Sequence, residues 1–150
     1  MSRKQQGSVF AKLRRKWMPQ FSISRPQFVL GMFALVAADL VAREQKIRTR
    51  AGREHLLQIH VKRADLGKTE HAMNSLIAAL AWDEARFGLS LDLERFMIVA
   101  VEDFNFGAME NKGLNLFNTK CVLASADTAT DDDFFAVESV VAHEYFHNWT

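Results

Sequence analysis

The sequence contains one cysteine, two prolines and seven glycines in 150 residues. The single cysteine, Cys121, excludes an intrachain disulfide framework and any zinc site built on pairs of cysteines. Glycine and proline are scarce, while 49% of the residues are hydrophobic and 25% are charged, so collagen-like, low-complexity and disordered classes are excluded for most of the chain. The sequence is therefore that of a globular protein, in which histidine and carboxylate side chains would have to hold any metal ion.

Each end of the chain lacks charge of one sign. Residues 1–38 contain seven lysines and arginines and no acidic residue, so they carry a net charge of +7, while the remainder carries −6, from 12 bases and 18 acids. After Lys120 there is no lysine or arginine, and the six acidic residues there are Asp127, Asp131, Asp132, Asp133, Glu138 and Glu144. A surface of this sign repels nucleic-acid phosphates and suits a metal cation or an ammonium group. We therefore expect no nucleic-acid partner.

The basic head is followed by an apolar stretch at residues 28–38, which is well short of the ~20 residues that a membrane-spanning helix needs. Two interpretations fit it. A basic region before a short apolar run with the small residues Ala37 and Ala38 is typical of a secretory or organellar targeting segment. The basic region is long for such a segment, and the run also fits a buried strand at 33–37. We expect a buried strand at residues 33–37. We also expect a cytoplasmic protein without a membrane span. The role of the basic extension at residues 1–26 is left unassigned.

Alternating strand and helix patterns follow along the chain. Two extended runs, at 47–50 and 56–61 around the turn 51–53, predict a hairpin with one apolar face formed by Leu57, Ile59 and Val61. Apolar residues then recur at helical spacing from Met73 to Phe87, and Gly88 provides a stop. The remaining elements are expected to be a buried strand at 96–101, a half-exposed strand at 114–117 and a helix capped by Thr130 or Asp131 that runs to the end of the chain. Together these elements predict an α+β fold.

The last predicted helix contains two histidines at i and i+4, in the run His143-Glu144-Tyr145-Phe146-His147. Such histidines lie one turn apart on one helix face, so both imidazoles can reach a single ion, and Glu144 lies about 100° round the helix. Imidazole nitrogens suit Zn²⁺, the metal lowers the pKa of a bound water toward about 7, and a carboxylate that is not a ligand can accept its proton. The alternative is a solvated helix that carries two histidines by chance.

A second block, at residues 107–111, lies between two predicted strands and consists of Gly107, Ala108, Met109, Glu110 and Asn111. Taken alone, it fits a turn begun by glycine, with Met109 in the core and Glu110 in solvent. Together with residues 143–147, the block resembles the aminopeptidase N family of zinc metallopeptidases, whose hallmarks are G-A-M-E-N followed by H-E-x-x-H. Further stretches are similar to the bacterial alanyl aminopeptidase branch, and the resemblance extends over the range 33–150; the similar stretches are 33–37, 82–84, 99–101, 107–118 and 143–150.

The resemblance implies a role for each residue of the two motifs. His143 and His147 would bind one Zn²⁺ ion, and Glu144 would be the general base that activates zinc-bound water. Glu110 would bind the free α-amino group of a peptide, while the backbone from Gly107 to Met109 would pair with the substrate as an added strand. An edge strand can align an extended peptide, and a carboxylate beside it can pair with an ammonium group. The expected protein is a zinc-dependent aminopeptidase, which removes the N-terminal residue of a peptide by hydrolysis. Its expected partner is a peptide substrate with a free N-terminus.

The resemblance also implies a fold. This would be a thermolysin-like (zincin) catalytic domain, of which residues 45–150 form the first part, preceded at residues 27–44 by the end of a β-rich N-terminal domain. In the family, a third zinc ligand, a Glu, lies roughly twenty residues after the second histidine, and catalytic zinc needs three protein ligands. The tyrosine that stabilises the tetrahedral intermediate also lies downstream. Because Thr150 precedes both positions, we expect the chain to be a segment of the enzyme that is inactive alone.

Two other functions stay open. An endopeptidase or related hydrolase would keep the zinc scaffold, although an unpaired Glu110 carboxylate opposite an internal peptide bond would be costly to bury. A non-catalytic truncated fragment of such an enzyme, lacking the third zinc ligand, would have a structural role or none. Outside the two motifs, His55, His60 and His71 are expected in ordinary structural or surface roles, and Cys121 is expected to be a small buried hydrophobic residue. Side-chain preference and oligomeric state are left unassigned.

Overall fold

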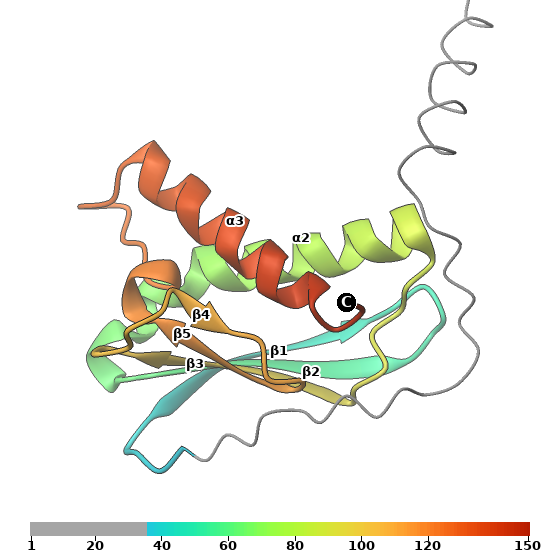
Figure 1. Cartoon of the computed structure of the whole chain (residues 1–150), viewed down its shortest axis with the longest axis horizontal. Coiled ribbons are helices and arrows are strands. Elements are labelled where there is room, and N and C mark those ends of the chain that lie inside the picture. The colour runs from blue at the N-terminus through green and yellow to red at the C-terminus, as the bar shows by residue number, and fades with distance from the viewer. Residues whose placement is uncertain (1–35) are drawn as a thin grey trace, which may run out of the picture. The chain divides into compact units, whose positions relative to one another are not determined.

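The computed structural model of the chain describes residues 36–150. Within them, five strands and two α-helices are joined by loops and two short 3₁₀-helices (Figure 1). In chain order the elements are β1 (Val41–Arg48), β2 (Glu54–Val61), η1 (Arg63–Thr69), α2 (Glu70–Phe87), β3 (Arg95–Val101), β4 (Ala108–Met109), β5 (Leu114–Asn118), η2 (Thr119–Cys121) and α3 (Asp131–Phe146). The predicted combination of a sheet with helices is confirmed.

The strands form one mixed sheet in the order β1-β2-β3-β5-β4. β1 and β2 form the predicted antiparallel hairpin, β2, β3 and β5 run parallel, and β4 lies antiparallel to β5. The step from β2 to β3 passes through η1 and α2, since parallel neighbours need a long crossover connection. Both α-helices lie on the same face of the sheet (Figure 1). β4 is therefore an edge strand in a sheet that is covered by α2 and α3 on one side.

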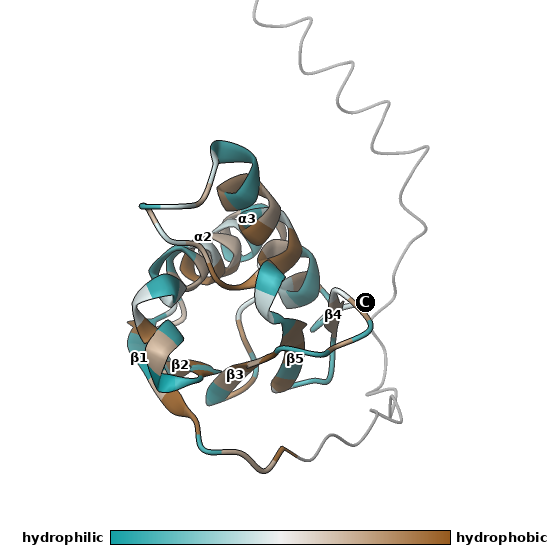
Figure 2. Cartoon of the chain, turned by 90° about the vertical axis from the view of Figure 1, so that its left-hand side faces the viewer, coloured by the Kyte–Doolittle hydropathy of each residue, from teal (hydrophilic) through white to brown (hydrophobic). Residues whose placement is uncertain are grey.

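The core fills the space between the sheet and the two helices, which Figure 2 shows as two layers. The predicted apolar face of β2 is confirmed, because Leu57, Ile59 and Val61 are all buried. Full burial of an aliphatic or aromatic side chain stabilises a fold by about 1.5–3 kcal/mol. Across this layer the helices contribute, among others, Leu76, Leu80, Val137, Val141 and Tyr145. On α3 the buried residues Val137, Val141 and Tyr145 face the sheet, so the opposite side of this helix faces away from the core.

Both helices begin or end where their local sequence predicts. Gly88 follows α2 with φ +71°, and its N–H donates to the Glu84 carbonyl (3.1 Å), so glycine ends the helix in the left-handed conformation that it favours. Thr130 caps α3, and its hydroxyl accepts from the backbone N–H of Asp133. The Asp133 carboxylate in turn accepts from the backbone N–H of Thr130 (2.8 Å), which completes a capping box.

The prediction that the last helix runs to the end of the chain is wrong, because α3 ends at Phe146. The backbone N–H groups of Asn148 and Trp149 donate to carbonyls only three residues earlier, and the Asn148 side chain donates to the Tyr145 carbonyl (2.7 Å). These bonds tighten the chain into a 3₁₀-like turn. His147 is the C-cap of the helix, with φ −62° and ψ −8°, so it keeps its place one turn after His143.

The first strand begins earlier than predicted. β1 starts at Val41 and not at Ile47, and it pairs with β2 from Val41 opposite Val61 to Arg48 opposite Glu54. Polar residues such as Glu44 and Lys46 have low strand propensity, but β1 is an edge strand and most of it is at least partly exposed. Pairing with β2 therefore decides its structure.

Two predictions concern the start of the chain, of which the structure describes only residues from 36 onward. Of the strand predicted at 33–37, the structure describes residues 36 and 37, and these precede β1 without forming a strand. The rest of that segment, and the basic extension, lie outside the described residues. The predicted domain boundary between residues 44 and 45 falls inside β1, and the division into domains stays a prediction.

Candidate active site

Helix α3 brings the two predicted metal ligands together. The Nε2 atoms of His143 and His147 lie 3.1 Å apart. The two rings are nearly perpendicular, with centroids 4.8 Å apart. Two nitrogens bound to one tetrahedral zinc ion, at about 2.0–2.1 Å each, are roughly 3.3 Å apart. The pair therefore fits a single ion, and it is accessible, because His143 is exposed and His147 is half-buried.

Glu144, between the two histidines in the chain, is buried. It is only 8% exposed, and its Oε2 atom has no hydrogen-bond partner among the described residues. Burial raises the pKa of the Glu144 carboxyl, and the charge of Glu110 adds to this rise, while His143 and His147 oppose it. A carboxylate with a free oxygen and a raised pKa is suited to accept a proton. The environment of Glu144 therefore fits a general base.

Strand β4 presents the backbone that is expected to hold a peptide. Ala108 and Met109 lie opposite Phe117 and Leu116 of β5, and the Asn118 N–H donates to the Gly107 carbonyl (2.8 Å). Among the described residues, β4 has no strand on its other side, and α3 packs against it. A free strand edge can accept an extended peptide. Glu110 follows directly after β4 and is exposed, so a carboxylate stands at the end of this edge.

Asn111 shapes the turn from β4 to β5. Its N–H donates to the Met109 carbonyl (3.1 Å), and its own carbonyl accepts from the Leu114 N–H (2.9 Å). Gly113 completes the turn with φ +84°, a conformation that favours glycine. The Asn111 side chain is buried, and its Nδ2 atom has no partner in the described part of the chain. Asn111 therefore supports the block structurally, and its part in substrate binding stays a prediction.

Two histidines outside the motif are held by backbone carbonyls. The His55 Nδ1 atom donates to the Leu93 carbonyl (2.7 Å), and the His71 Nε2 atom donates to the Phe134 carbonyl (2.9 Å). Both fill the structural roles expected of them. Within residues 36–150, no three His, Cys, Asp or Glu side chains gather closely enough to hold a metal ion. The described residues thus offer a pair of imidazoles and no complete ligand set.

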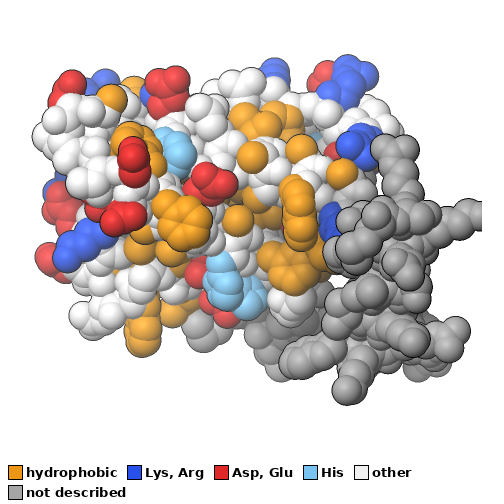
Figure 3. Space-filling view, turned by 90° about the horizontal axis from the view of Figure 1, so that it is seen from above, with side chains coloured by type: hydrophobic (Ala, Val, Ile, Leu, Met, Phe, Trp, Pro, Cys, Tyr) orange, Lys and Arg blue, Asp and Glu red, His pale blue; other side chains and the backbone are white. Residues whose placement is uncertain are grey.

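A groove of about 740 Å³ runs between α2 and α3 and includes His143 in its lining. Its other walls are largely apolar and aromatic, with Trp82, Phe87 and Phe146, and two acidic residues, Asp83 and Glu138, also line it. Figure 3 shows this outer face of the helices, with apolar side chains gathered around histidines and carboxylates. Apolar surface therefore lies next to His143, one of the two proposed metal ligands.

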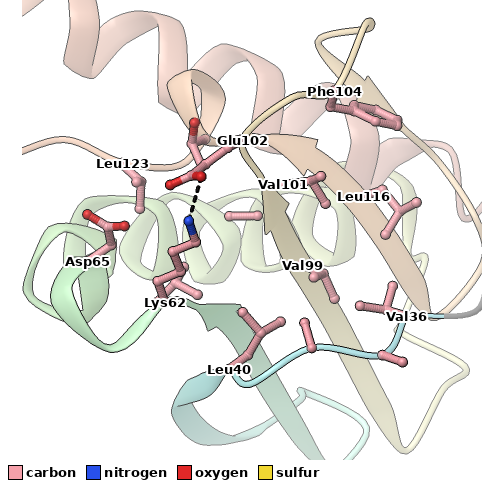
Figure 4. Close-up of a pocket in the computed structure, with 15 residues that line it drawn as sticks. Val36, Leu40, Lys62, Asp65, Val99, Val101, Glu102, Phe104, Leu116 and Leu123 are labelled. Atoms are coloured by element: carbon pink, nitrogen blue, oxygen red, sulfur yellow. Dashed lines mark hydrogen bonds and ion pairs between the residues drawn. The ribbon is translucent and has the colours of Figure 1, made fainter.

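A second cavity, of about 420 Å³, lies between β3, β5 and the segment before β1. Figure 4 shows the apolar side chains of Leu40, Val99 and Leu116 around it, and an ion pair between Lys62 and Glu102. Its described lining contains none of the predicted catalytic, metal or substrate residues. This cavity is separate from the candidate active site.

The expectation that Cys121 is a small buried hydrophobic residue is confirmed in part, because it packs against the core. It is half-buried, and its Sγ atom lies 3.9 Å from the point where a Cβ atom on Gly107 would stand. Burial raises the pKa of the Cys121 thiol, and the charge of Glu144 adds to this rise. Cys121 therefore lies beside both motif blocks. Cys121 lies just after β5, the strand that pairs with β4. This position could have predicted that Cys121 lies near Gly107, but the sequence analysis did not use it.

Comparison with known proteins places residues 107–111 and 143–147 in one family match. The model of the peptidase family M1 domain matches residues 71–150. The chain belongs to peptidase family M1. It is 58% identical to aminopeptidase N of Haemophilus influenzae and 56% identical to aminopeptidase N of Escherichia coli, each over 119 residues and 79% of this chain. The crystal structure of Legionella pneumophila aminopeptidase A in complex with aspartic acid covers 74% of the chain with a TM-score of 0.72 and 39% identity.

The M1 match contains residues 107–111 and 143–147, so the family expected from the two motifs is confirmed. The chain spans 14% of the length of these two aminopeptidases N and 13% of the Legionella chain. Among residues 36–150, no helix has the length and apolar character needed to cross a membrane.

Proposed function

We propose that this M1 segment carries the zinc-binding and substrate-aligning part of an aminopeptidase that removes N-terminal residues from peptides. The observation that carries the proposal is the convergence of the His143 and His147 Nε2 atoms, 3.1 Å apart, beside the buried Glu144 carboxylate. The names of the relatives, aminopeptidase N, support the same reaction class. The fold proposed for the complete catalytic domain is thermolysin-like.

Zinc would be held by His143 and His147, with a third protein ligand supplied from outside residues 36–150. When bound, it would supply a Lewis acid that lowers the pKa of water and polarises the scissile carbonyl. Glu144 stays free of the metal and removes the proton from the attacking water, then transfers it to the leaving amine. Its burial and its unpaired oxygen keep it available for this exchange.

The free edge of β4 would align the substrate. The backbone of Gly107 to Met109 forms hydrogen bonds with the peptide as an added strand, and Glu110 pairs with its terminal ammonium group. Glu110 directly follows β4, and α3, which carries Glu144, packs against β4, so the amine-binding carboxylate and the base stand on neighbouring elements. Since only the first residue of a peptide presents an α-ammonium group on its backbone, this pairing would restrict cleavage to the N-terminal bond.

A second candidate is a non-catalytic M1 fragment. The observation that favours it is the ligand set, because residues 36–150 gather no group of three metal-ligating side chains. An endopeptidase is disfavoured by Glu110, because an internal peptide segment bound along the free edge would bury this carboxylate without an ammonium partner. We also propose a cytoplasmic location for the protein. Removal of the basic extension at residues 1–26 would test whether that segment has a targeting role.

The test is an assay of the full-length gene product that contains these 150 residues, with alanyl-p-nitroanilide as substrate. We expect hydrolysis that a chelator abolishes and added zinc restores. His143→Ala and His147→Ala should each lower bound zinc and activity together, while His60→Ala, on β2 and outside the motif, should change neither. A product that binds zinc but releases no nitroaniline, or that retains activity in both histidine variants, would reject the proposal.

A further inference from the structure

The turn after α3 brings the side chain of Thr150 back to His147. Just beyond the helix the backbone tightens into a 3₁₀-like turn, in which the Asn148 side chain donates to the Tyr145 carbonyl (2.7 Å). At the end of this turn the Thr150 Oγ1 atom lies 3.3 Å from the His147 Nδ1 atom, within hydrogen-bond distance. Local structure therefore places a hydroxyl group beside one ring nitrogen of a proposed metal ligand.

The two ring nitrogens of His147 have different partners. Its Nε2 atom lies 3.1 Å from the His143 Nε2 atom, and its Nδ1 atom lies 3.3 Å from Thr150 Oγ1. A neutral imidazole carries one N–H group, so one of its nitrogens donates and the other accepts, while a hydroxyl can do either. The position of a single proton on His147 therefore decides the direction of both hydrogen bonds.

Metal binding requires one of the two arrangements. A ring nitrogen that binds zinc uses its lone pair, so the proton stands on the other nitrogen. Metal-binding histidines almost always donate that second N–H to an oxygen or a water, which fixes the tautomer and the orientation of the ring. With Nε2 of His147 as the metal-binding atom, Nδ1–H is the donor. Thr150 Oγ1 then stands where such a histidine needs its acceptor.

We propose that Thr150 is a positioning residue for His147. Its hydroxyl accepts from the Nδ1–H group and holds the ring in the tautomer whose Nε2 lone pair is free before a metal ion arrives. In the metal-free chain the same tautomer directs the bond between the two imidazoles, so that His143 Nε2–H donates to His147 Nε2. The effect on metal affinity rests on the proposed function, whereas the tautomer follows from the two hydrogen bonds alone.

The first experiment observes the tautomers in the metal-free 150-residue chain, labelled with ¹⁵N. Long-range ¹H–¹⁵N correlation spectra distinguish protonated from unprotonated ring nitrogens, and alkaline buffer keeps imidazoles neutral. His55 and His71 serve as internal references and as a check of the fold. Because a carbonyl only accepts, His55 carries its proton on Nδ1 and His71 carries its proton on Nε2. The His143→Ala and His147→Ala variants assign the remaining signals.

We expect His147 to be protonated on Nδ1 and His143 on Nε2. Thr150→Val removes the hydroxyl at similar size, and it should lower the ratio of Nδ1–H to Nε2–H forms of His147 by about 2- to 12-fold, the range for one net hydrogen bond. Thr150→Ser keeps the hydroxyl and should retain the parent ratio. Every chain in this comparison ends in the same carboxylate, so that group cannot cause a difference between them.

Thr128→Val is the matched control, because Thr128 is an exposed threonine in the loop before α3. It should leave the spectra of the motif histidines unchanged. A parent chain with His147 protonated on Nε2 overturns the proposal. So does a Thr150→Val chain that keeps the parent ratio while the signals of His55 and His71 show an intact fold.

The second experiment measures zinc affinity in the full-length gene product by competition with a chromophoric chelator, so the result does not depend on turnover. Thr150→Val should weaken zinc binding by about 10- to 100-fold, Thr150→Ser should restore most of it, and Thr128→Val should have no effect. Unchanged affinity in Thr150→Val overturns the effect on metal binding and leaves the proposed peptidase standing. A parent protein that binds no zinc rejects the proposed function, and the tautomer spectra still decide the role of Thr150.

Discussion

Glu110 directly follows β4 and Glu144 lies on α3, which packs against β4, so two carboxylates from distant parts of the chain stand on neighbouring elements. Burial raises the pKa of Glu144, and the charge of Glu110 adds to this rise. Glu110 is exposed and Glu144 is buried, so the two carboxylates have different environments. An exposed carboxylate can pair with an ammonium group, while a buried one with a raised pKa can exchange a proton. The two roles proposed for these residues follow from this difference.

The first prediction concerns the base. In the full-length gene product, Glu144→Gln should reduce kcat by about 10²–10⁴-fold or more, because general-base catalysis contributes that much. Bound zinc should be unchanged, since Glu144 is not assigned as a ligand. Metal analysis of the same preparations as the activity assay checks both halves. The control is Glu138→Gln on the same helix, which should retain turnover. Loss of zinc in the Glu144 variant would show that this carboxylate is a ligand.

The second prediction concerns Glu110 and the α-amino group of the substrate peptide. Glu110→Ala should lower kcat/KM for peptides with a free N-terminus by about 10- to 150-fold, because a charge-assisted hydrogen bond is worth roughly 1.5–3 kcal/mol. An N-acetylated peptide should be a poor substrate for the parent enzyme, and the variant should lose little more on it. Steady-state kinetics with a matched pair of free and acetylated peptides gives the comparison. Equal turnover of the two by the parent enzyme contradicts the aminopeptidase and favours an endopeptidase.

Local signals predicted much of this molecule. The helix α2, its stop at Gly88 and the cap at Thr130 depend on residues within one or two turns, and all three are confirmed. The spacing of His143 and His147 likewise needs only helix geometry, so the convergence of their Nε2 atoms could be predicted before the fold was known.

Features that depend on distant partners were missed. β1 begins at Val41 because β2 pairs with it, and its polar side chains conceal this in the sequence. The turn after Phe146 depends on the Asn148 side chain, which competes with continuation of the helix. Cys121 lies beside Gly107 and Glu144 only because β4, η2 and α3 come together in the fold. β1 and Cys121 therefore depend on tertiary contacts, whereas the end of α3 depends on a local side-chain hydrogen bond that the helical pattern does not reveal.

A third prediction uses the buried Asp83. This residue is 3% exposed, its Oδ2 atom has no partner among the described residues, and burial raises the pKa of its carboxyl. A raised pKa favours the protonated form on folding, so its contribution to stability is present at low pH and is lost as the pH rises through the folded-state pKa. Asp83→Asn should therefore stabilise the chain at pH 7 by about 0.5–1 kcal/mol.

Thermal unfolding from pH 7 down toward pH 4 measures this effect. The gain from Asp83→Asn should shrink as the pH falls, because the parent residue then becomes neutral as well. Asp127→Asn replaces an exposed carboxylate and should show no such pH-dependent gain. A gain that is constant with pH would mean that ionisation of Asp83 is not its cause.

A fourth prediction tests the start of α3. Thr130→Ala removes the hydroxyl that accepts from the Asp133 N–H, and it should lower the free energy of unfolding by about 0.5–2 kcal/mol. Thr130→Ser keeps the hydroxyl and should lose much less. Urea unfolding gives the difference, with Thr128→Ala in the preceding loop as the control. Equal losses for the alanine and serine variants would show that the methyl group of Thr130, and not its cap, is important.

The last prediction is for residues 1–150 expressed alone, which should hold zinc weakly and show no appreciable aminopeptidase activity. The described residues supply two imidazoles and no third ligand, whereas a catalytic zinc needs three protein ligands and an open position. Glu144 cannot complete the set without giving up its role as base. Equilibrium dialysis against zinc and an alanyl-p-nitroanilide assay measure both properties, and His143→Ala should abolish the weak binding that remains. Tight stoichiometric zinc with clear turnover would mean that a further ligand comes from elsewhere in these residues or from a second copy of the chain. The His143 and His147 pair would then be part of a complete centre in the chain as it stands.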